Sequence, residues 1–429
     1  MLLSVLLTLP ALAAAHSSWY QPRDSPVHDL FKRQNNGTKP DWKTNADGWR
    51  ATYPEQWKVP PVETIPKEWT DKLNSIKLPE GCPVANKKGG SSITYPDNKD
   101  GNSPEICSFT YGCHNEQDVF AGPDGVFVLT FDDGPTEASP ELYDFLKQNN
   151  ITKAATHFYI GGQVIALPQS ARDAFDNGGH LAVHTWSHQM TSTLSNEQVV
   201  AELGWTMQAI YDVTGRLPLF WRPPYGDTDN RVRAIAKEVF GMIPVLWNKD
   251  TNDWQIGEKQ DHTVDSVTNE MKGWFHEDKN PGIVALEHEL NDQTVQVFLN
   301  VYPEASQTGW KFLSVADAFG FNWYQNSKTN ADEVFDKNLK VGQPGTILYQ
   351  NQTTSTAAPQ PSGSANATTG ANNGTAHHNS SSSNGGAVNN ANGTQPSAKP
   401  SADGKSAAGA LTASVAGVAV AAVAAALSM

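Results

Sequence analysis

From residue 126 onward, short apolar runs rich in β-branched residues alternate with stretches whose apolar residues recur at helical spacing. The runs with the length and composition of buried strands cover residues 126–131, 155–160, 180–184, 219–222, 242–247, 282–286 and 310–314. Helical patterns lie between them, over residues 139–150, 168–177, 196–214, 230–239, 264–275 and 291–300. Such alternation predicts parallel strands joined by crossover helices. We therefore predict an α/β fold, a distorted (β/α) barrel of about seven parallel strands with its site at the carboxyl ends of the strands.

The region before this alternation has a different pattern. Between residues 40 and 118 no helix or strand period continues for long, and tryptophan and proline are frequent. We expect an extended segment that wraps the surface of the barrel. Its tryptophans either pin the segment to the core, which the pattern favours, or stack on sugar rings where they are exposed. They are Trp42, Trp49, Trp57 and Trp69.

The first residues of the chain predict export. Residues 1–15 are almost entirely apolar and end in small alanines, which is typical of a signal peptide, although a positive charge at the start is missing. A short N-terminal core helix is the alternative interpretation. Lys32 and Arg33 form a dibasic pair, which either marks a processing site that makes residues 16–33 a propeptide or is an ordinary charged pair.

From residue 350 to the end the chain has no Phe, Trp or Tyr and consists mainly of Ser, Thr, Asn, Gly, Ala and Pro. Such a segment cannot bury enough apolar area to offset the entropy of ordering it. We expect residues 350–405 to form a glycosylated linker. Acceptor sites for N-linked glycans are Asn351, Asn366, Asn373, Asn379 and Asn392 in this linker, and Asn36 and Asn150 outside it.

Residues 406–429 have the layout of a signal for attachment of glycosylphosphatidylinositol (GPI). Small residues around the candidate sites Gly404 and Ser406 precede a spacer and an uncharged apolar tail, residues 415–427. The tail is shorter than the roughly 20 apolar residues of a membrane helix, and a weak transmembrane anchor is the alternative. We expect a secreted protein whose GPI lipid holds it at the cell membrane and in the cell wall.

The charge balance argues against nucleic acid as a partner. The chain has 31 Lys and Arg against 45 Asp and Glu, a formal net charge of −14. Binding to phosphate groups needs a basic surface that this balance does not supply.

The cysteines are few and odd in number. In a secreted protein, three cysteines imply one disulfide and a remaining thiol, or an intermolecular bond. The pair Cys107 and Cys113, which closes a small loop, is the first candidate for the disulfide. A bond from Cys82 to either of them stays open.

Two segments at strand ends carry candidate chemistry. The first strand ends in Thr130-Phe131-Asp132-Asp133-Gly134-Pro135, and adjacent carboxylates of a strand point to different sides of the backbone. One can then bind a cation while the other faces the water that the cation activates, although a cap-and-turn role explains the pair equally well. The third strand ends in His184-Thr185-Trp186-Ser187-His188, where histidines four residues apart can share one metal. Together with a carboxylate they form the ligand set of a catalytic zinc site.

Both segments resemble the first two motifs of the polysaccharide deacetylases, the NodB-homology domain of carbohydrate esterase family four. Segments that resemble the three remaining motifs follow in the same order: Arg222-Pro223-Pro224-Tyr225, Asp250-Thr251-Asn252-Asp253-Trp254 and Leu286-Glu287-His288. The resemblance covers about residues 125–321, so we place the catalytic domain at residues 118–325. An N-terminal extension over 34–117 and a C-terminal extension over 326–349 flank it.

The resemblance implies a role for each matching residue. Asp133, His184 and His188 would bind the metal. Asp132 would be the general base, His288 the general acid, and the backbone N–H of Tyr225 an oxyanion donor.

It also implies supporting roles around these groups. Arg222 would orient and polarise Asp132, and Asp250 or Asp253 would support that network or His288. Trp254 and Leu286 would line the pocket for the acetyl methyl group.

The resemblance therefore implies a metal-dependent hydrolase, most like a fungal GPI-anchored chitin deacetylase, that removes N-acetyl groups from chitin or partly deacetylated chitin. Zn²⁺ is the expected metal, and Co²⁺ or Mn²⁺ also suits such a site. An O-acetyl esterase acting on another wall glycan such as acetylxylan, and an inactive wall-binding protein, are the alternatives. The sequence does not set the oligomeric state.

Overall fold

The computed structural model describes residues 39–345 and 347–350. The predicted signal peptide, propeptide and GPI signal, and the glycosylated linker apart from residue 350, lie outside the described residues. So do the acceptor sites Asn36, Asn351, Asn366, Asn373, Asn379 and Asn392 and the candidate attachment sites Gly404 and Ser406. The acceptor site Asn150 is described, and it is exposed just after a helix that ends at Gln148.

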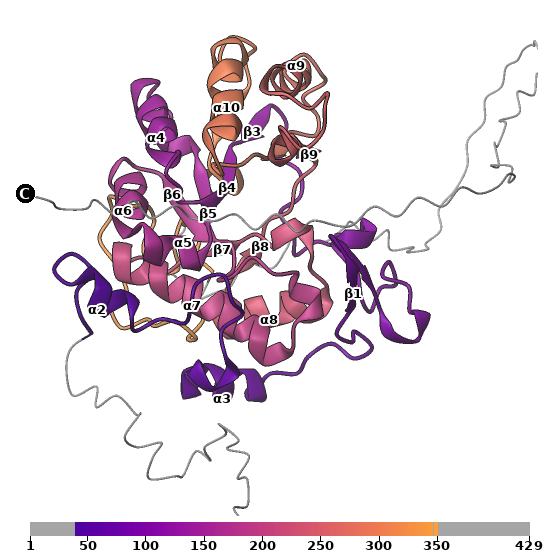
Figure 1. Ribbon diagram of the computed structural model, residues 1–429, viewed down its shortest axis with the longest axis vertical. Coiled ribbons are helices and arrows are strands. Elements are labelled where there is room, and N and C mark those ends of the chain that lie inside the picture. The colour runs from indigo at the N-terminus through magenta and orange to yellow at the C-terminus, as the bar shows by residue number, and fades with distance from the viewer. Residues whose placement is uncertain (1–38, 346, 351–429) are drawn as a thin grey trace, which may run out of the picture. The chain divides into compact units, whose positions relative to one another are not determined.

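Parallel strands form the centre of the fold (Figure 1). They are β3 (Val126–Val128), β4 (Thr130–Gly134), β5 (Thr156–Tyr159), β6 (His180–Val183), β7 (Phe220–Trp221), β8 (Ile243–Pro244), β9 (Lys249–Asp250), β10 (Ile283–Leu286) and β11 (Lys311–Leu313). One sheet has the order β4-β5-β6-β7-β8 and the other β11-β3-β10-β9. The chain runs from β3 into β4 and from β8 into β9, and a parallel bridge joins Asp132 to His288. The strands thus close into a distorted barrel, which confirms the predicted fold class.

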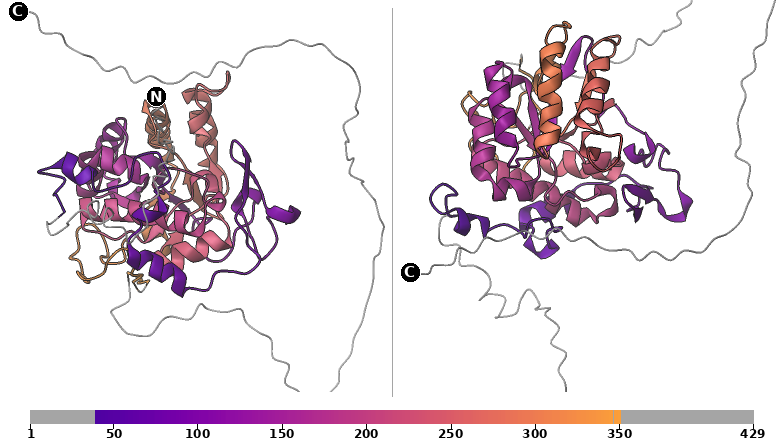
Figure 2. Two further views of the ribbon diagram at one scale, coloured as in Figure 1. Left: turned by 60° about the horizontal axis from the view of Figure 1, so that its bottom comes forward. Right: turned by 45° about the horizontal axis from the view of Figure 1, so that its top comes forward.

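Helices surround this barrel, as Figure 1 and the two views of Figure 2 show. They are α4 (Ser139–Gln148), α5 (Gly161–Ala166), α6 (Pro168–Asp176), α7 (Asn196–Thr214), α8 (Asn230–Phe240), α9 (Val264–Trp274), α10 (Asp292–Ala305) and α11 (Val315–Phe319). The bounds of α7 agree with the predicted 196–214 because both ends carry strong signals. Ser195 and Gln198 form a capping box at its start, and Gly215 ends it in the left-handed conformation.

The N-terminal extension is less extended than the sequence predicts. It contains the helices α2 (Ala46–Arg50) and α3 (Lys67–Ser75) and a hairpin of β1 (Asn86–Gly89) and β2 (Ser92–Thr94). The expectation of extended chain is therefore wrong for these parts. In α3 two large apolar residues four positions apart, Trp69 and Leu73, are buried on one side of the helix, a pattern too short to stand out as a period.

Short 3-10 helices occupy several connections. They are η1 (Val62–Thr64), η2 (Pro96–Asn98), η3 (Phe109–Tyr111), η4 (Thr152–Ala154), η5 (Thr191–Thr193), η6 (Pro224–Gly226) and η7 (Asp253–Gln255).

The tryptophans of the extension mostly fasten it to the catalytic domain and to the C-terminal extension. Trp42, Trp49 and Trp69 are buried, whereas Trp57 is 52% exposed. The indole of Trp49 donates to Asp212 of α7 at 2.9 Å, and that of Trp69 donates to the carbonyl oxygen of Val341 at 2.9 Å. Buried aromatic rings with satisfied N–H groups stabilise such contacts, so pinning is their main role.

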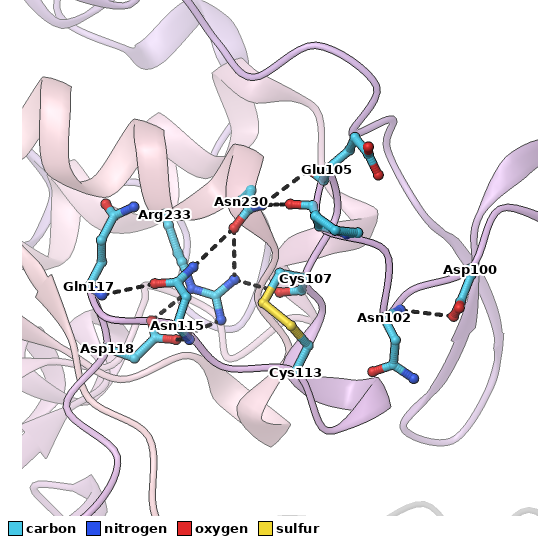
Figure 3. The surroundings of a disulfide bond; sticks show 11 residues. Asp100, Asn102, Glu105, Cys107, Cys113, Asn115, Gln117, Asp118, Asn230 and Arg233 are labelled. Atoms are coloured by element: carbon cyan, nitrogen blue, oxygen red, sulfur yellow. Dashed lines mark hydrogen bonds and ion pairs between the residues drawn. A yellow bond between two sulfur atoms is a disulfide. The ribbon is translucent and has the colours of Figure 1, made fainter. Parts of the chain in front are cut away.

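A disulfide joins Cys107 to Cys113, with an S–S distance of 2.06 Å, and Cys82 is a buried free thiol. Figure 3 shows Arg233 of α8 between this loop and Asp118. Its guanidinium donates to the carbonyl oxygen of Cys107 at 2.6 Å and forms an ion pair with Asp118 at 2.7 Å. The disulfide loop is therefore fastened to the side of the barrel that carries α8.

Candidate active site

The carboxyl ends of the strands bring the motif residues together. Asp132 and Asp133 lie in β4, and His184 and His188 follow β6. Arg222 directly follows β7, and His288 comes two residues after β10. In a parallel barrel these strand ends share one face, so residues far apart in the sequence meet there.

The backbone at Asp133 differs from the regular strand that the sequence predicts. The pairing of β4 with β5 is irregular between Asp132 and Gly134, and Asp133 has a φ of 70°. The two carboxylates consequently do not point to opposite sides. Asp133 Oδ1 lies 3.4 Å and Asp132 Oδ2 lies 3.8 Å from the same atom, Nε2 of His184. A bulge re-aims a side chain in this way, and nothing in the pattern of polar residues reveals it.

Asp133, His184 and His188 form a group that fits a metal ion, with ligand atoms all within 4.8 Å of one another. His184 Nδ1 lies 2.8 Å from the carbonyl oxygen of Arg222. Since a carbonyl only accepts, Nδ1 carries a proton, and Nε2 is the nitrogen left to face a cation. His188 Nε2 lies 3.2 Å from Asp133 Oδ1, a buried oxygen that accepts no hydrogen bond. A buried carboxylate oxygen facing two imidazole nitrogens suits a divalent cation.

The electrostatics of this group also suit a cation. Burial by itself raises the pKa of Asp133, but the facing rings of His188 and His184 outweigh it and hold that pKa well below its usual range. Burial lowers the pKa of His188 to about 4, although Asp133 acts in the opposite direction. At neutral pH the carboxylate is therefore ionised and His188 is neutral, which are the forms that bind metals.

Arg222 holds Asp132 in place. It is fully buried, and its Nη1 donates to Asp132 Oδ1 at 2.9 Å and to Thr130 Oγ1 at 2.7 Å. Burial lowers the pKa of Arg222, while Asp132 raises it. The other guanidinium nitrogens reach the carbonyl oxygens of Val245 and Leu246, at 3.2 and 3.3 Å. A planar donor fixed at so many points leaves the carboxylate little freedom to rotate.

Of the two acidic residues in the fourth motif, the structure joins Asp253 to His288. Asp253 Oδ1 lies 2.5 Å from His288 Nδ1, and Oδ2 accepts the backbone N–H of His288 at 2.9 Å. Asp250 instead accepts the backbone N–H of Asn252 at 2.8 Å within a turn. Burial alone would lower the pKa of His288, but Asp253, followed by Asp133 and Asp132, raises it to about 10. His288 is therefore protonated at neutral pH.

The remaining predicted residues border this cluster. Tyr225 lies in η6 with a φ of 59°, and its ring is centred 4.8 Å from that of His188. Tyr225 is 54% exposed and Trp254, in η7 next to Asp253, is 44% exposed. Leu286, at the end of β10, is buried. Tyr225 thus lies against a metal-ligand candidate in space, and Trp254 lies next to Asp253 in the chain.

The motifs assign no role to the two carboxylates that flank His288 in the chain, Glu287 and Glu289. Glu289 is fully buried; its Oε1 lies 2.7 Å from His157 Nδ1, and its Oε2 accepts from Tyr143 at 3.0 Å. Its backbone N–H donates to the carbonyl oxygen of Asp132 at 3.0 Å. Glu287 is buried without a hydrogen-bond partner for either oxygen, and burial followed by Asp253 raises its pKa well above the usual value. In the sequence, only their position next to His288 indicates that these two glutamates belong to the site.

Comparison with known proteins places these motifs in a family. The family model described as polysaccharide deacetylase matches residues 121–240. The chain is 51% identical over 337 residues to chitin deacetylase 3 of Cryptococcus neoformans var. neoformans serotype D, with 77% of this chain and 80% of that protein covered. The chain belongs to the polysaccharide deacetylase family. Because the alignment is longer than the predicted catalytic domain, the likeness of this deacetylase to its relative extends beyond that domain.

Other relatives of this deacetylase are more distant. It is 36% identical over 275 residues to chitin deacetylase 2 of Cryptococcus neoformans var. grubii serotype A, with 59% of this chain and 58% of the relative covered. It is 36% identical over 230 residues to chitin deacetylase 1 of Saccharomyces cerevisiae, with 53% and 71% covered. A solved chitin deacetylase of Colletotrichum lindemuthianum aligns with 47% of this chain and 90% of its own, at 22% identity and a TM-score of 0.43.

Proposed function

We propose that this polysaccharide deacetylase removes N-acetyl groups from chitin, giving chitosan and acetate, in the modification of a fungal cell wall. The observation that carries the proposal is the joint placement of a candidate metal group, the carboxylate Asp132 and the protonated His288 at one end of the barrel. The similarity to curated chitin deacetylases supports chitin as the substrate.

The chemistry that amide hydrolysis requires matches these groups. An amide is a poor electrophile, so the reaction needs an activated water, a base for its proton and an acid for the departing amine. Asp133, His184 and His188 would hold a divalent cation, which would supply Lewis-acid polarisation of the carbonyl and activation of the water. We propose Zn²⁺ for this group, because two histidines and one carboxylate form a typical catalytic zinc site.

Asp132 acts as the general base in this proposal. Arg222 fixes its Oδ1 at 2.9 Å, and the free face of the carboxylate is directed at the metal-binding group, with Oδ2 3.8 Å from His184 Nε2. Asp132 therefore lies beside the candidate metal ligands, where it would take the proton of the attacking water.

His288 acts as the general acid. Its Nδ1 is bonded to Asp253, so Nε2 is the nitrogen that delivers a proton to the leaving amine. The backbone N–H of Tyr225, held in an unusual conformation at φ 59°, stabilises the negative charge that develops on the carbonyl oxygen. We assign Trp254 and Leu286 to the pocket for the acetyl methyl group, as the family resemblance implies.

The substrate is tested by acetate release from two acetylated glycans. The purified protein, loaded with Zn²⁺, is incubated in parallel with N-acetylglucosamine oligomers and with acetylated xylan, and acetate is quantified. Release from the oligomers at much higher kcat/KM than from xylan supports N-deacetylation of chitin. Release from xylan alone would show that the enzyme is an O-acetyl esterase, and release from neither would favour a wall-binding protein without activity.

We further propose that the enzyme is secreted and held at the cell surface by a GPI lipid. The apolar residues 1–15, the Ser-, Thr- and Asn-rich residues 350–405 and the apolar tail 415–427 support this localisation. Within residues 39–345 and 347–350, no helix combines the length and hydropathy needed to cross a bilayer. Release of the protein from intact cells by a phosphatidylinositol-specific phospholipase is the expected result. Release by detergent alone would show a transmembrane anchor instead.

A further inference from the structure

The segment between His184 and His188, residues 185–187, has a conformation that its own residues do not favour. Thr185 has a φ of 62° and His188 a φ of 57°, both in the left-handed region that non-glycine residues seldom adopt. Such a conformation persists only where the surroundings hold it. The positions of both imidazole rings depend on this short segment.

Glu202, in the middle of α7, is the side chain that binds the segment. It is fully buried. Its Oε2 accepts the backbone N–H groups of Trp186 at 2.7 Å and Ser187 at 2.8 Å. Its Oε1 accepts the hydroxyl of Ser187 at 2.5 Å. One carboxylate therefore satisfies two buried backbone donors and one side chain between the two histidines.

The carbonyl groups of the same segment have equally definite partners. Gly161 and Gly162, at the start of α5, donate to the carbonyl oxygens of Thr185 at 2.9 Å and Trp186 at 3.1 Å. The segment is thus held from α5 on one side and from α7 on the other. Two weaker links add to these: the Gln189 side-chain amide donates to the carbonyl oxygen of Ser187 at 3.3 Å, and the indole of Trp186 donates to the carbonyl oxygen of Glu55 at 3.0 Å.

The position of Glu202 is costly for the fold. Among the described residues Glu202 forms no ion pair, and burying a carboxylate that lacks a cationic partner disfavours the folded state. An apolar residue would pack in the middle of a buried helix without this cost, but it would leave the N–H groups of Trp186 and Ser187 unsatisfied. The buried carboxylate therefore stabilises residues 185–187 and does not stabilise α7 itself.

We propose that Glu202 is a positioning residue of the metal centre: through its bonds to Trp186 and Ser187 it sets the spacing of His184 and His188 and thereby the affinity for the metal. Glu202 is not one of the three candidate metal ligands, and its carboxylate bonds only the segment between two of them. This role rests on the proposed metal-dependent function, because it assumes that His184 and His188 bind a cation. Partners that orient metal ligands typically change metal affinity by about 10- to 100-fold when they are replaced.

The test compares substitutions that keep or remove the hydrogen bonds. Glu202→Gln keeps them, because the amide oxygen can accept both backbone N–H groups while the amide nitrogen donates to the Ser187 hydroxyl. Glu202→Leu has a similar volume and removes them. The control is Glu197→Leu on the same helix, where the carboxylate accepts from the Ser195 hydroxyl at 2.9 Å and not from residues 185–187.

Zn²⁺ affinity is measured by competition with a chromophoric chelator, and the visible spectrum of the Co²⁺ form reports the ligand geometry. We expect Glu202→Leu to weaken Zn²⁺ binding by about 10-fold or more and to alter the Co²⁺ spectrum. Glu202→Gln and Glu197→Leu should keep the affinity and the spectrum of the parent protein.

A folded Glu202→Leu protein with the parent affinity would overturn the proposal, and so would Glu202→Gln binding as weakly as Glu202→Leu. If Glu202→Leu does not fold, Glu202→Asp decides, because the shorter side chain reaches the segment less well. Weaker Zn²⁺ binding supports the role and unchanged binding contradicts it. Since no substrate is present, the outcome is independent of whether chitin is the substrate.

Discussion

Asp253 binds His288 twice: its Oδ1 lies 2.5 Å from the ring nitrogen Nδ1, and its Oδ2 accepts the backbone N–H of the same residue at 2.9 Å. The first contact stabilises the protonated ring and the second fixes the residue that carries it. Burial acts against protonation, yet Asp253 and the nearby Asp133 and Asp132 raise the pKa of His288 to about 10. The carboxylate thereby keeps a buried imidazole charged over the neutral range.

This pair predicts the direction of a change in the pH profile. A general acid works while it is protonated, so the rate falls as the pH rises through its pKa. Asp253→Asn removes the charge that raises the pKa of His288, so the alkaline limb of kcat should move to lower pH. The profile is measured by acetate release from N-acetylglucosamine oligomers at saturating metal.

Asp250→Asn is the control for this experiment, because Asp250 bonds the backbone of Asn252 and not His288. It should move the alkaline limb less than Asp253→Asn does. An alkaline limb that stays in place in Asp253→Asn would mean that His288 is not the acid.

The variants Asp132→Asn and His184→Ala should lose activity for different reasons. Asp132→Asn keeps the size of the side chain but removes the base, and we expect kcat to fall by about 10²- to 10⁴-fold while metal still binds. His184→Ala removes a ligand of the metal group and should lose the metal. Metal content by elemental analysis and kcat are measured on the same samples. Near-parent rates in Asp132→Asn would refute its role as base.

The N-terminal extension should contribute strongly to stability. The indole of Trp69 is buried and bonded to the carbonyl oxygen of Val341, so Trp69→Ala removes packing and a hydrogen bond together. We expect the free energy of unfolding to fall by about 3–5 kcal/mol. Denaturant titration measures it.

Trp57→Ala is the matched control, since this tryptophan is 52% exposed. Its effect should stay within about 0.5 kcal/mol. Equal losses in the two variants would contradict the view that buried tryptophans fasten the extension.

The sequence predicts the strands and long helices well because their signals are local. The helix 196–214 has a capping box and a terminal glycine, and its bounds agree with the structure. Helix α3 was missed because its buried side rests on Trp69 and Leu73 alone. The hairpin of β1 and β2 was missed as well, since all four residues of β1 are exposed and show no alternation.

The sequence predicts the identity of the site residues better than their geometry. Nothing local marks the bulge at Asp133, which depends on the pairing of β4 with β5. Asp250 and Asp253 lie three residues apart in one motif, and only the fold places one of them against His288. Glu202 lies within a helix, where an acidic residue usually faces solvent, so its contact with residues 185–187 has no sequence signal.

The most direct test of metal-dependent deacetylation by this site is acetate release from N-acetylglucosamine oligomers before chelation, after chelation and after Zn²⁺ is restored. The account predicts release that chelation abolishes and Zn²⁺ recovers in the parent protein, and no recovery in His184→Ala. Release that persists after complete removal of metal from the folded protein would contradict the central claim.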